Sequence, residues 1–358
     1  MINFRITGVT SRDIELFSRY QKRIFFSKTD LALPAKNFNS INKQAIDSII
    51  YEKFKIHPQQ IVLLKPSTNH KVYQVKCANL SYIVRFALVD KLFKSLNFIK
   101  QKWVMEKLTQ KKLPAIKIYQ IDFSRKNIAC DFSIEQSAQG KTLYDLFKEN
   151  NSDIKLFFKL GQFVANIHSI KTKKFGPLDI SSIIKSGQGL GIYNSWSKYL
   201  LLNLETHLKV CLDIKAIDSK TYLRIKQVFT KLVGIVSDVS PRLLHGDLAN
   251  HNIFSDGKKI TAIIDWEDCI SGDPIFDIAF FGTGAFRKKI WFNQFIKGYQ
   301  TQQKLPKDFN IRYWLYYLRI SISKTVIRHK LQLPENSFTK NHLSRINKSL
   351  NKLESLIK

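Results

Sequence analysis

Short stretches with strand-like patterns lie between residues 60 and 135. Residues 61–64 are all apolar, residues 71–77 and 82–87 alternate between polar and apolar, and turn-forming segments at 66–69 and 78–79 separate the three stretches. Side chains alternate between the two faces of a strand, so this pattern predicts an antiparallel meander of three strands. A helix and two further strands are predicted after the meander, at 94–110, 117–122 and 128–135.

From Gly140 onward the apolar positions recur mainly at helical spacing. One amphipathic face is formed by Leu156, Leu160, Phe163, Val164 and Ile167. Further helices are predicted at 220–236, 290–300, 311–330 and the C-terminus, and short strands at 242–245 and 260–264. Another helix, over 40–54 with Ser40 as its N-cap, precedes the strands.

These patterns predict an α+β protein with two lobes. A length of 358 residues agrees with this, because single cores stop growing at ~250–300 residues. A small antiparallel-sheet N-lobe is predicted over 40–136 and a larger, mainly helical C-lobe over 137–358. Residues 1–39 form an N-terminal extension to which the sequence assigns no role.

The chain is strongly basic, with 58 Lys and Arg against 28 Asp and Glu and a net charge of +30. The bases are dispersed, which is typical of solvated surfaces and does not favour a nucleic-acid partner, although 287–358 could form a basic surface. Four scattered cysteines indicate neither zinc nor disulfides and fit a reducing cytoplasm. No run approaches the ~18–20 apolar residues that span a membrane, and residues 1–13 lack the apolar core of a signal peptide. We therefore expect a cytoplasmic protein.

One segment reverses the charge of the chain. Residues 241–280 contain only three basic residues and seven carboxylates: Asp247, Asp256, Asp265, Glu267, Asp268, Asp273 and Asp277. Acids gathered around a loop need a cation, and carboxylate and amide oxygens suit Mg²⁺. The segment therefore predicts a magnesium site.

Spacing within this segment assigns roles to three side chains. Asp247 and Asn252 form the D-x-x-x-x-N arrangement of a phosphoryl-transfer loop, with Asp247 placed to accept the proton of an attacking hydroxyl. Asn252 offers an amide oxygen to a metal, and Asp265, at the end of the next strand, offers a carboxylate. The alternative is that these acids only cap turns. The neighbouring His245-Gly246 and Gly272-Asp273-Pro274 make that alternative the weaker one.

The motifs Leu244–Asp247, Asn252, Ile263–Glu267 and Gly272–Asp277 resemble the aminoglycoside phosphotransferase and choline kinase-like family, which has a protein kinase-like fold. This resemblance implies that Asp247 is the catalytic base and that Asn252 and Asp265 are magnesium ligands. It also implies further contacts, in which Asp277 braces the loop that contains His245, the turn with Ser67 and Asn69 covers the ATP phosphates, and the backbone from Gln136 to Ala138 holds adenine.

Two positions depart from the family pattern. Arg85 stands on the third strand where the family has Lys, and it keeps the charge that the phosphates require. Gln101 stands where the partner helix usually has Glu, while Glu106 lies five residues further along. Five residues correspond to about 140° around a helix, so only one of the two can face Arg85.

The resemblance implies a kinase that uses ATP and Mg²⁺ to phosphorylate a hydroxyl of a small molecule. The alternatives are a nucleotide-binding pseudokinase or basic scaffold, which the two departures favour, and a nucleic-acid binder. The acceptor stays open. Glu267, Asp268 and Asp273 would suit a cationic acceptor, and Tyr193, Trp196 and Tyr199 would suit a choline-type cage, although clustered aromatics are more often part of a core.

Overall fold

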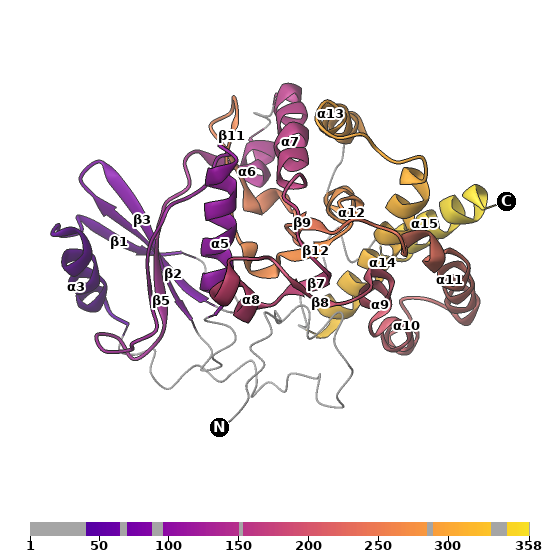
Figure 1. The fold of residues 1–358 in the computed structure, drawn as a ribbon, viewed down its shortest axis with the longest axis horizontal. Helices are drawn as coiled ribbons and strands as arrows, with labels where there is room; N and C mark the ends of the chain where they lie inside the picture. Colours follow the sequence, from indigo (N-terminus) through magenta and orange to yellow (C-terminus); the bar gives the residue numbers. More distant parts are fainter. Residues whose placement is uncertain are drawn as a thin grey trace.

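The computed structural model describes residues 41–64, 70–87, 96–149, 153–284, 289–330 and 342–357. The extension 1–39 and the turn with Ser67 and Asn69 therefore lie outside the described residues, and the expectations for them stay predictions. Figure 1 shows a small lobe built on one sheet beside a larger lobe that contains most of the helices. The α+β, two-lobed architecture is thus confirmed, whereas its exact division at 136 stays a prediction.

The N-lobe sheet has the strand order β1-β2-β3-β5-β4, with every neighbouring pair antiparallel. Its strands are β1 (Gln60–Leu63), β2 (His70–Cys77), β3 (Leu80–Ala87), β4 (Ile118–Asp122) and β5 (Phe132–Gln136). The first three form the predicted meander. In the register of β3 with β5, Arg85 lies opposite Ser133 and Ile83 opposite Glu135. Because alternate residues share a face, Ser133 and Glu135 lie on the same side of β5.

Two helices pack against this sheet. Helix α3 (Lys43–Phe54) buries Ile46, Ile49 and Ile50 against the small N-lobe core. Helix α5 (Asn97–Gln110) lies between the sheet and the C-lobe (Figure 1) and contributes to the large C-lobe core. The N-cap of α3 is Asn42, whose side chain accepts from the backbone N–H of Ala45 at 2.8 Å, so the prediction of Ser40 as the cap was wrong.

Helices form most of the C-lobe. Its longer helices are α7 (Ile154–Ile167), α10 (Leu204–Asp213), α11 (Ser219–Leu232), α12 (Ile275–Thr283), α13 (Lys289–Gln300), α14 (Phe309–Lys330) and α15 (His342–Leu356). Its shorter helices are α6 (Leu143–Lys148), α8 (Ile180–Ser186), α9 (Trp196–Leu201) and the 3₁₀ turns η2 (Val233–Val236), η3 (Asn250–Asn252) and η4 (Trp266–Asp268). The amphipathic face predicted from Leu156 to Ile167 is buried in α7.

Two small sheets carry the acidic segment. Strands β10 (Ile253–Ser255) and β11 (Ile260–Ile263) form a hairpin that also pairs with β6 (Lys141–Thr142). Strands β7 (Phe175–Leu178), β8 (Gly191–Tyr193), β9 (Arg242–Leu244) and β12 (Ile270–Gly272) form the second sheet, in the order β8-β7-β12-β9. The predicted strands at 242–245 and 260–264 therefore belong to different sheets. Strand β10, which was not predicted, pairs with the strand at 260–263 to form the hairpin.

Candidate active site

The loop between β9 and β10 is held from behind by Asp277 on α12. One oxygen of its buried carboxylate accepts from the backbone N–H of His245 at 2.6 Å, and the other accepts from that of Gly246 at 2.9 Å. His168 approaches the same carboxylate with Nε2 at 3.3 Å, and its Nδ1 lies 3.0 Å from the hydroxyl of Tyr299. Asp277 thus makes the contacts to the loop that the family resemblance implies. Tyr299, buried behind it, was missed.

Gly246 is required by the shape of this loop. Its φ of +79° lies in the left-handed region, which side chains disfavour. A Cβ atom at this position would also overlap the backbone carbonyl of Asp268, which packs directly against the loop. The glycine therefore allows the loop to lie against the segment that follows Asp265.

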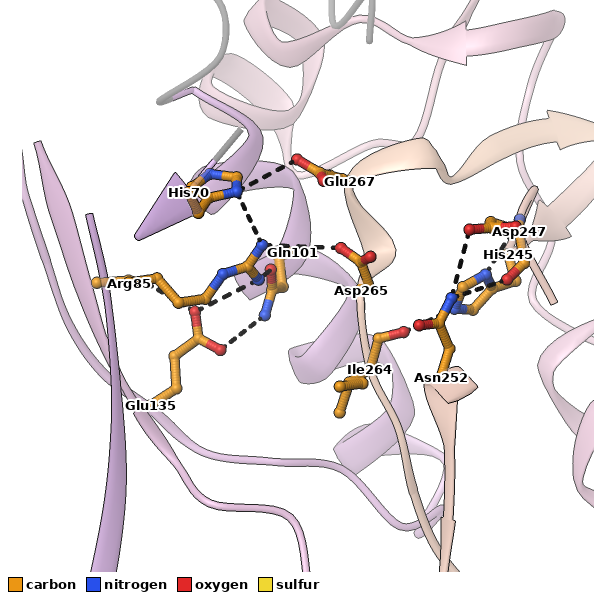
Figure 2. Close-up of polar contacts among 11 residues, drawn as sticks. His70, Arg85, Gln101, Glu135, His245, Asp247, Asn252, Ile264, Asp265 and Glu267 are labelled. Carbon is orange, nitrogen blue, oxygen red and sulfur yellow. Dashed lines mark hydrogen bonds and ion pairs between the residues drawn. The ribbon is translucent and has the colours of Figure 1, made fainter. Parts of the chain in front are cut away.

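Asp247 and Asn252 face each other across this loop. The side-chain amide nitrogen of buried Asn252 donates to the backbone carbonyl of Asp247 at 3.1 Å and lies 3.4 Å from its carboxylate Oδ2. Because the nitrogen is used in this way, the amide oxygen is directed away from Asp247 (Figure 2). The structure therefore brings together two of the three residues that spacing singled out, with the amide oriented to offer its oxygen.

His245 connects this pair to Asp265. Its Nδ1 accepts from the backbone N–H of Asp247 at 3.2 Å, and its Nε2 lies 2.9 Å from the carbonyl oxygen of Ile264. This pattern requires the ring proton on Nε2, since a carbonyl only accepts. The imidazole thus fixes the loop to the end of the hairpin, one residue before Asp265.

Asp265 has the environment of a cation ligand. Its backbone takes a left-handed φ of 66°, which Asp tolerates better than most residues. Its Oδ1 is buried and has no hydrogen-bond partner among the described residues, with Nη2 of Arg85 3.7 Å away. Burial, and then the negative charge of Glu267, raise the pKa of Asp265 to about 6 against the opposing effect of Arg85, and Asp247 raises it further.

A magnesium ion suits this donor set. Within the described ranges, no group of three or more His, Cys, Asp and Glu side chains could hold a metal by itself. Mg²⁺ usually takes one or two protein oxygens and completes its shell with water and phosphate oxygens. The carboxylate of Asp265 and the amide oxygen of Asn252 match that requirement.

Arg85 lies opposite, on β3, within a buried polar network (Figure 2). Its Nη1 donates to the side-chain oxygen of Gln101 at 2.7 Å, and Gln101 donates in turn to Glu135 at 3.0 Å. Its Nη2 lies 3.3 Å from Nδ1 of His70. Burial lowers the pKa of Arg85, but the surrounding carboxylates, led by Glu135, more than reverse this effect, so the pKa is raised and the charge is retained.

Glu106 does not take part in this network. Its side chain is 56% exposed and lies 4.0 Å from Lys102, one turn earlier on α5. Of the two candidates on α5, Gln101 therefore faces Arg85, and the helix turns Glu106 to solvent, so a supporting role for Glu106 at Arg85 is ruled out. Glu135 and His70 were missed. The polar residues Ser133 and Glu135, which alternate with apolar ones on β5, were the available signal.

In the segment predicted to hold adenine, two backbone N–H groups already form hydrogen bonds within the protein. The backbone N–H of Gln136 donates to the carbonyl of Lys117 at 2.7 Å, and that of Ser137 donates to the carbonyl of Ser81 at 3.1 Å. Neither of these donors is available to a nucleotide. A contact from the backbone of Ala138 or from the carbonyl of Gln136 stays a prediction.

Several residues considered for the acceptor are structural. Asp273 is buried and accepts from the hydroxyl of Tyr316 at 2.6 Å and from the N–H of Ile275 at 3.1 Å. Trp196 and Tyr199 are buried in the C-lobe core, so they cannot form a cage for a cation. Of the acids considered, only Glu267 and Asp268 keep partial exposure near the loop.

The architecture is that of a kinase-like phosphotransferase, with a small lobe built on an antiparallel sheet and a larger helical lobe. The helical lobe contains the loop with Asp247 and Asn252, followed by a hairpin that ends just before Asp265. The chain belongs to the phosphotransferase enzyme family, whose model matches residues 62–308. Hygromycin-B 4-O-kinase of Escherichia coli is 22% identical over 240 residues, which are 66% of this chain and 65% of that protein. The chain thus spans just under two thirds of that curated relative.

Solved structures share the fold. A thermostable mutant of aminoglycoside phosphotransferase APH(4)-Ia, in a ternary complex with AMP-PNP and hygromycin B, has a TM-score of 0.64 at 19% identity, covering 86% of this chain and 98% of that chain. The GDP complex of an aminoglycoside 2'-phosphotransferase-IIIa mutant has a TM-score of 0.62 at 15% identity, covering 88% and 100%. The predicted kinase-like fold is therefore confirmed. Separately, none of the helices described here is long and apolar enough to span a membrane.

Proposed function

We propose that this protein uses ATP and Mg²⁺ to transfer a phosphoryl group to a hydroxyl of a small molecule. The observation that carries the proposal is the connection of Asp247, Asn252 and Asp265 into one unit by the hydrogen bonds of Asn252 and His245. Phosphoryl transfer needs positioned charges more than covalent chemistry, and a braced loop of this kind supplies them.

Each side chain would have a distinct part in the transfer. Asp247 would orient the acceptor hydroxyl and take its proton. Asn252 and Asp265 would hold Mg²⁺, which offsets the charge of the phosphate oxygens. Arg85 would contact the phosphates from the N-lobe side, since its Nη2 already lies 3.7 Å from Asp265.

For the acceptor, we propose only a chemical class. The related hygromycin-B 4-O-kinase is named for a hydroxyl acceptor, and Glu267 and Asp268 would give the region beside the catalytic loop local acidity. An amine-bearing polyol is therefore the first acceptor class to test. Choline is disfavoured because Trp196 and Tyr199 are buried.

A pseudokinase is the second candidate, favoured by the absence of an acid at Gln101. Pseudokinases of this kind would lack turnover but could still bind nucleotide. The buried carboxylate of Glu135, 3.8 Å from Nη1 of Arg85, supplies a countercharge from another element and weakens this candidate.

The test is an ADP-release assay over aminoglycosides, amino alcohols and sugars, with Mg²⁺ varied. We expect ADP release that depends on both an acceptor and Mg²⁺. Asp265→Asn keeps the shape of the side chain and tolerates the left-handed backbone, so it should raise the Mg²⁺ concentration at half-maximal rate by about tenfold or more. Asp238→Asn, at an exposed aspartate, is the matched control and should behave like the parent.

Acceptor-independent or Mg²⁺-independent ADP release would contradict the proposed reaction. Binding of MgATP without ADP release for every acceptor would favour the pseudokinase. An Asp265→Asn variant with the parent's Mg²⁺ dependence would remove Asp265 from the metal site.

A further inference from the structure

Helix α5 offers Arg85 no acid. Its only carboxylate is that of Glu106, which points to solvent, and Gln101 occupies the position that faces Arg85. A buried guanidinium still needs a countercharge, because an unpaired buried ion costs several kcal/mol. Two carboxylates from other elements lie within 4 Å of the guanidinium: Asp265 of the C-lobe at 3.7 Å from Nη2 and Glu135 of the N-lobe at 3.8 Å from Nη1. A countercharge fixed within the N-lobe itself therefore has to come from an element other than α5.

Glu135, on β5, meets this need. Its side chain is only 4% exposed, and its Oε1 lies 3.8 Å from Nη1 of Arg85. Ser133 donates to Oε1 at 2.6 Å and Gln101 donates to Oε2 at 3.0 Å, so both oxygens are satisfied. We propose that Glu135, acting through Gln101, is the positioning residue that holds Arg85 in place for the nucleotide phosphates, an inference that rests on the proposed function.

The two ends of the Arg85 guanidinium have separate tasks in this arrangement. Nη1 is anchored within the N-lobe by Gln101 and Glu135. Nη2 faces the other way, toward His70 and the Oδ1 of Asp265 in the C-lobe. The guanidinium is therefore held by the N-lobe through Nη1, while its Nη2 faces the side where the proposed metal and phosphates would lie. A lysine ammonium has a single nitrogen and could not be anchored and presented in the same way.

The sheet, rather than the helix, carries the charge that orients Arg85. Strands β3 and β5 are hydrogen-bonded neighbours, so Arg85 and Glu135 belong to the same rigid ladder. The helix contributes no charge to this contact: Gln101 supplies a neutral amide, which accepts from Arg85 and donates to Glu135. The ring of Phe98, also on the helix, lies 5.9 Å from the guanidinium carbon. Exchanging the amide and the carboxylate across this 3.0 Å contact would move the charge to the helix while keeping the total charge and the number of atoms nearly constant.

That exchange is the experiment. Purified Glu135→Gln, Gln101→Glu and the double variant would be compared with the parent for MgATP affinity by titration calorimetry, for kcat and KM by ADP release, and for melting temperature. Glu135→Gln removes the countercharge that the N-lobe supplies to Nη1 of Arg85, so it should weaken MgATP binding and raise the KM for ATP by about tenfold, with a smaller change in kcat. Gln101→Glu brings two carboxylates into contact and should also weaken binding.

The double variant restores one amide and one carboxylate and should recover affinity to within about threefold of the parent. Glu106→Gln is the control on the solvent face of α5 and should match the parent. A folded Glu135→Gln variant with the parent's MgATP affinity would overturn the inference, as would a double variant that binds no better than the single variants. A parent that binds no MgATP would refute the proposed function and this inference with it, and for that reason it is measured first.

Discussion

The catalytic loop and the Arg85 network are built in different ways. The loop gathers Asp247, Asn252 and Asp265 from a single stretch, in which a hairpin separates Asn252 from Asp265 and the ring of His245 bonds the loop to the end of that hairpin. The network around Arg85 draws His70, Gln101 and Glu135 from β2, α5 and β5. In the first region local geometry sets the distances, whereas in the second they follow only from how the sheet and the helix pack.

The difference also concerns how replaceable each residue is. The loop is fixed by hydrogen bonds from its backbone to Asp277 and by the left-handed φ of Gly246, so substitutions of Asp277 or Gly246 disturb the loop backbone itself. The network is fixed by side chains, and a countercharge can reach Arg85 from a strand as well as from a helix. We therefore expect substitutions in the loop to have larger effects than substitutions around Arg85.

The largest expected effect is that of Asp277→Ala. It leaves the backbone N–H groups of His245 and Gly246 and the ring of His168 without a buried acceptor, so we expect a loss of about 3–5 kcal/mol in the free energy of unfolding. Urea denaturation measures it. Glu149→Ala removes an exposed ion pair with Lys141 and should lose less than about 1 kcal/mol. Equal losses in the two variants would show that Asp277 does not brace the loop.

Arg85→Lys should have an intermediate effect. The charge stays, but one ammonium cannot contact Gln101 and Glu135 while also facing Asp265, so the KM for ATP should rise about tenfold, with kcat reduced less. Steady-state kinetics with varied ATP measures both constants. A lysine variant with parental kinetics would show that positive charge alone is sufficient at this position.

The smallest expected effect is that of Glu106→Gln. The side chain is largely exposed and its contact with Lys102 is 4.0 Å long, so stability should change by no more than about 0.5 kcal/mol and the KM for ATP should not change. The same kinetic and denaturation assays apply. A marked rise in KM would mean that α5 presents Glu106 to Arg85 in solution, and the account of the network would then be wrong.

The sequence allowed more to be predicted for the loop than for the network. Asp247, Asn252 and Asp265 stand at spacings that a loop and a hairpin preserve, so their proximity could be inferred without knowing the rest of the fold. The meander and the long helices were also predictable, because their apolar periodicity spans many residues. Strands of three residues are too short to show alternation, and of two such strands beside the loop, β9 was predicted and β10 was missed.

Glu135 could not be identified from local pattern alone. Its pairing with Arg85 depends on the order β3-β5 in the sheet and on the rotation of α5, which brings Gln101 inward. The burial of Asp273 was equally hidden, because its partners Tyr316 and Arg312 come from α14, some forty residues later in the chain. Contacts of this kind depend on tertiary packing, which a single sequence does not specify at the level of individual side chains.

The most direct test of the proposed phosphotransferase is the turnover of Asp247→Ala in the ADP-release assay, with MgATP affinity measured on the same sample. Asp247 would act on the acceptor hydroxyl and not on the nucleotide, so we expect kcat to fall by about 10²–10⁴-fold while MgATP affinity stays within about threefold of the parent. A variant that keeps the parent's kcat would contradict the proposal that this loop performs the transfer.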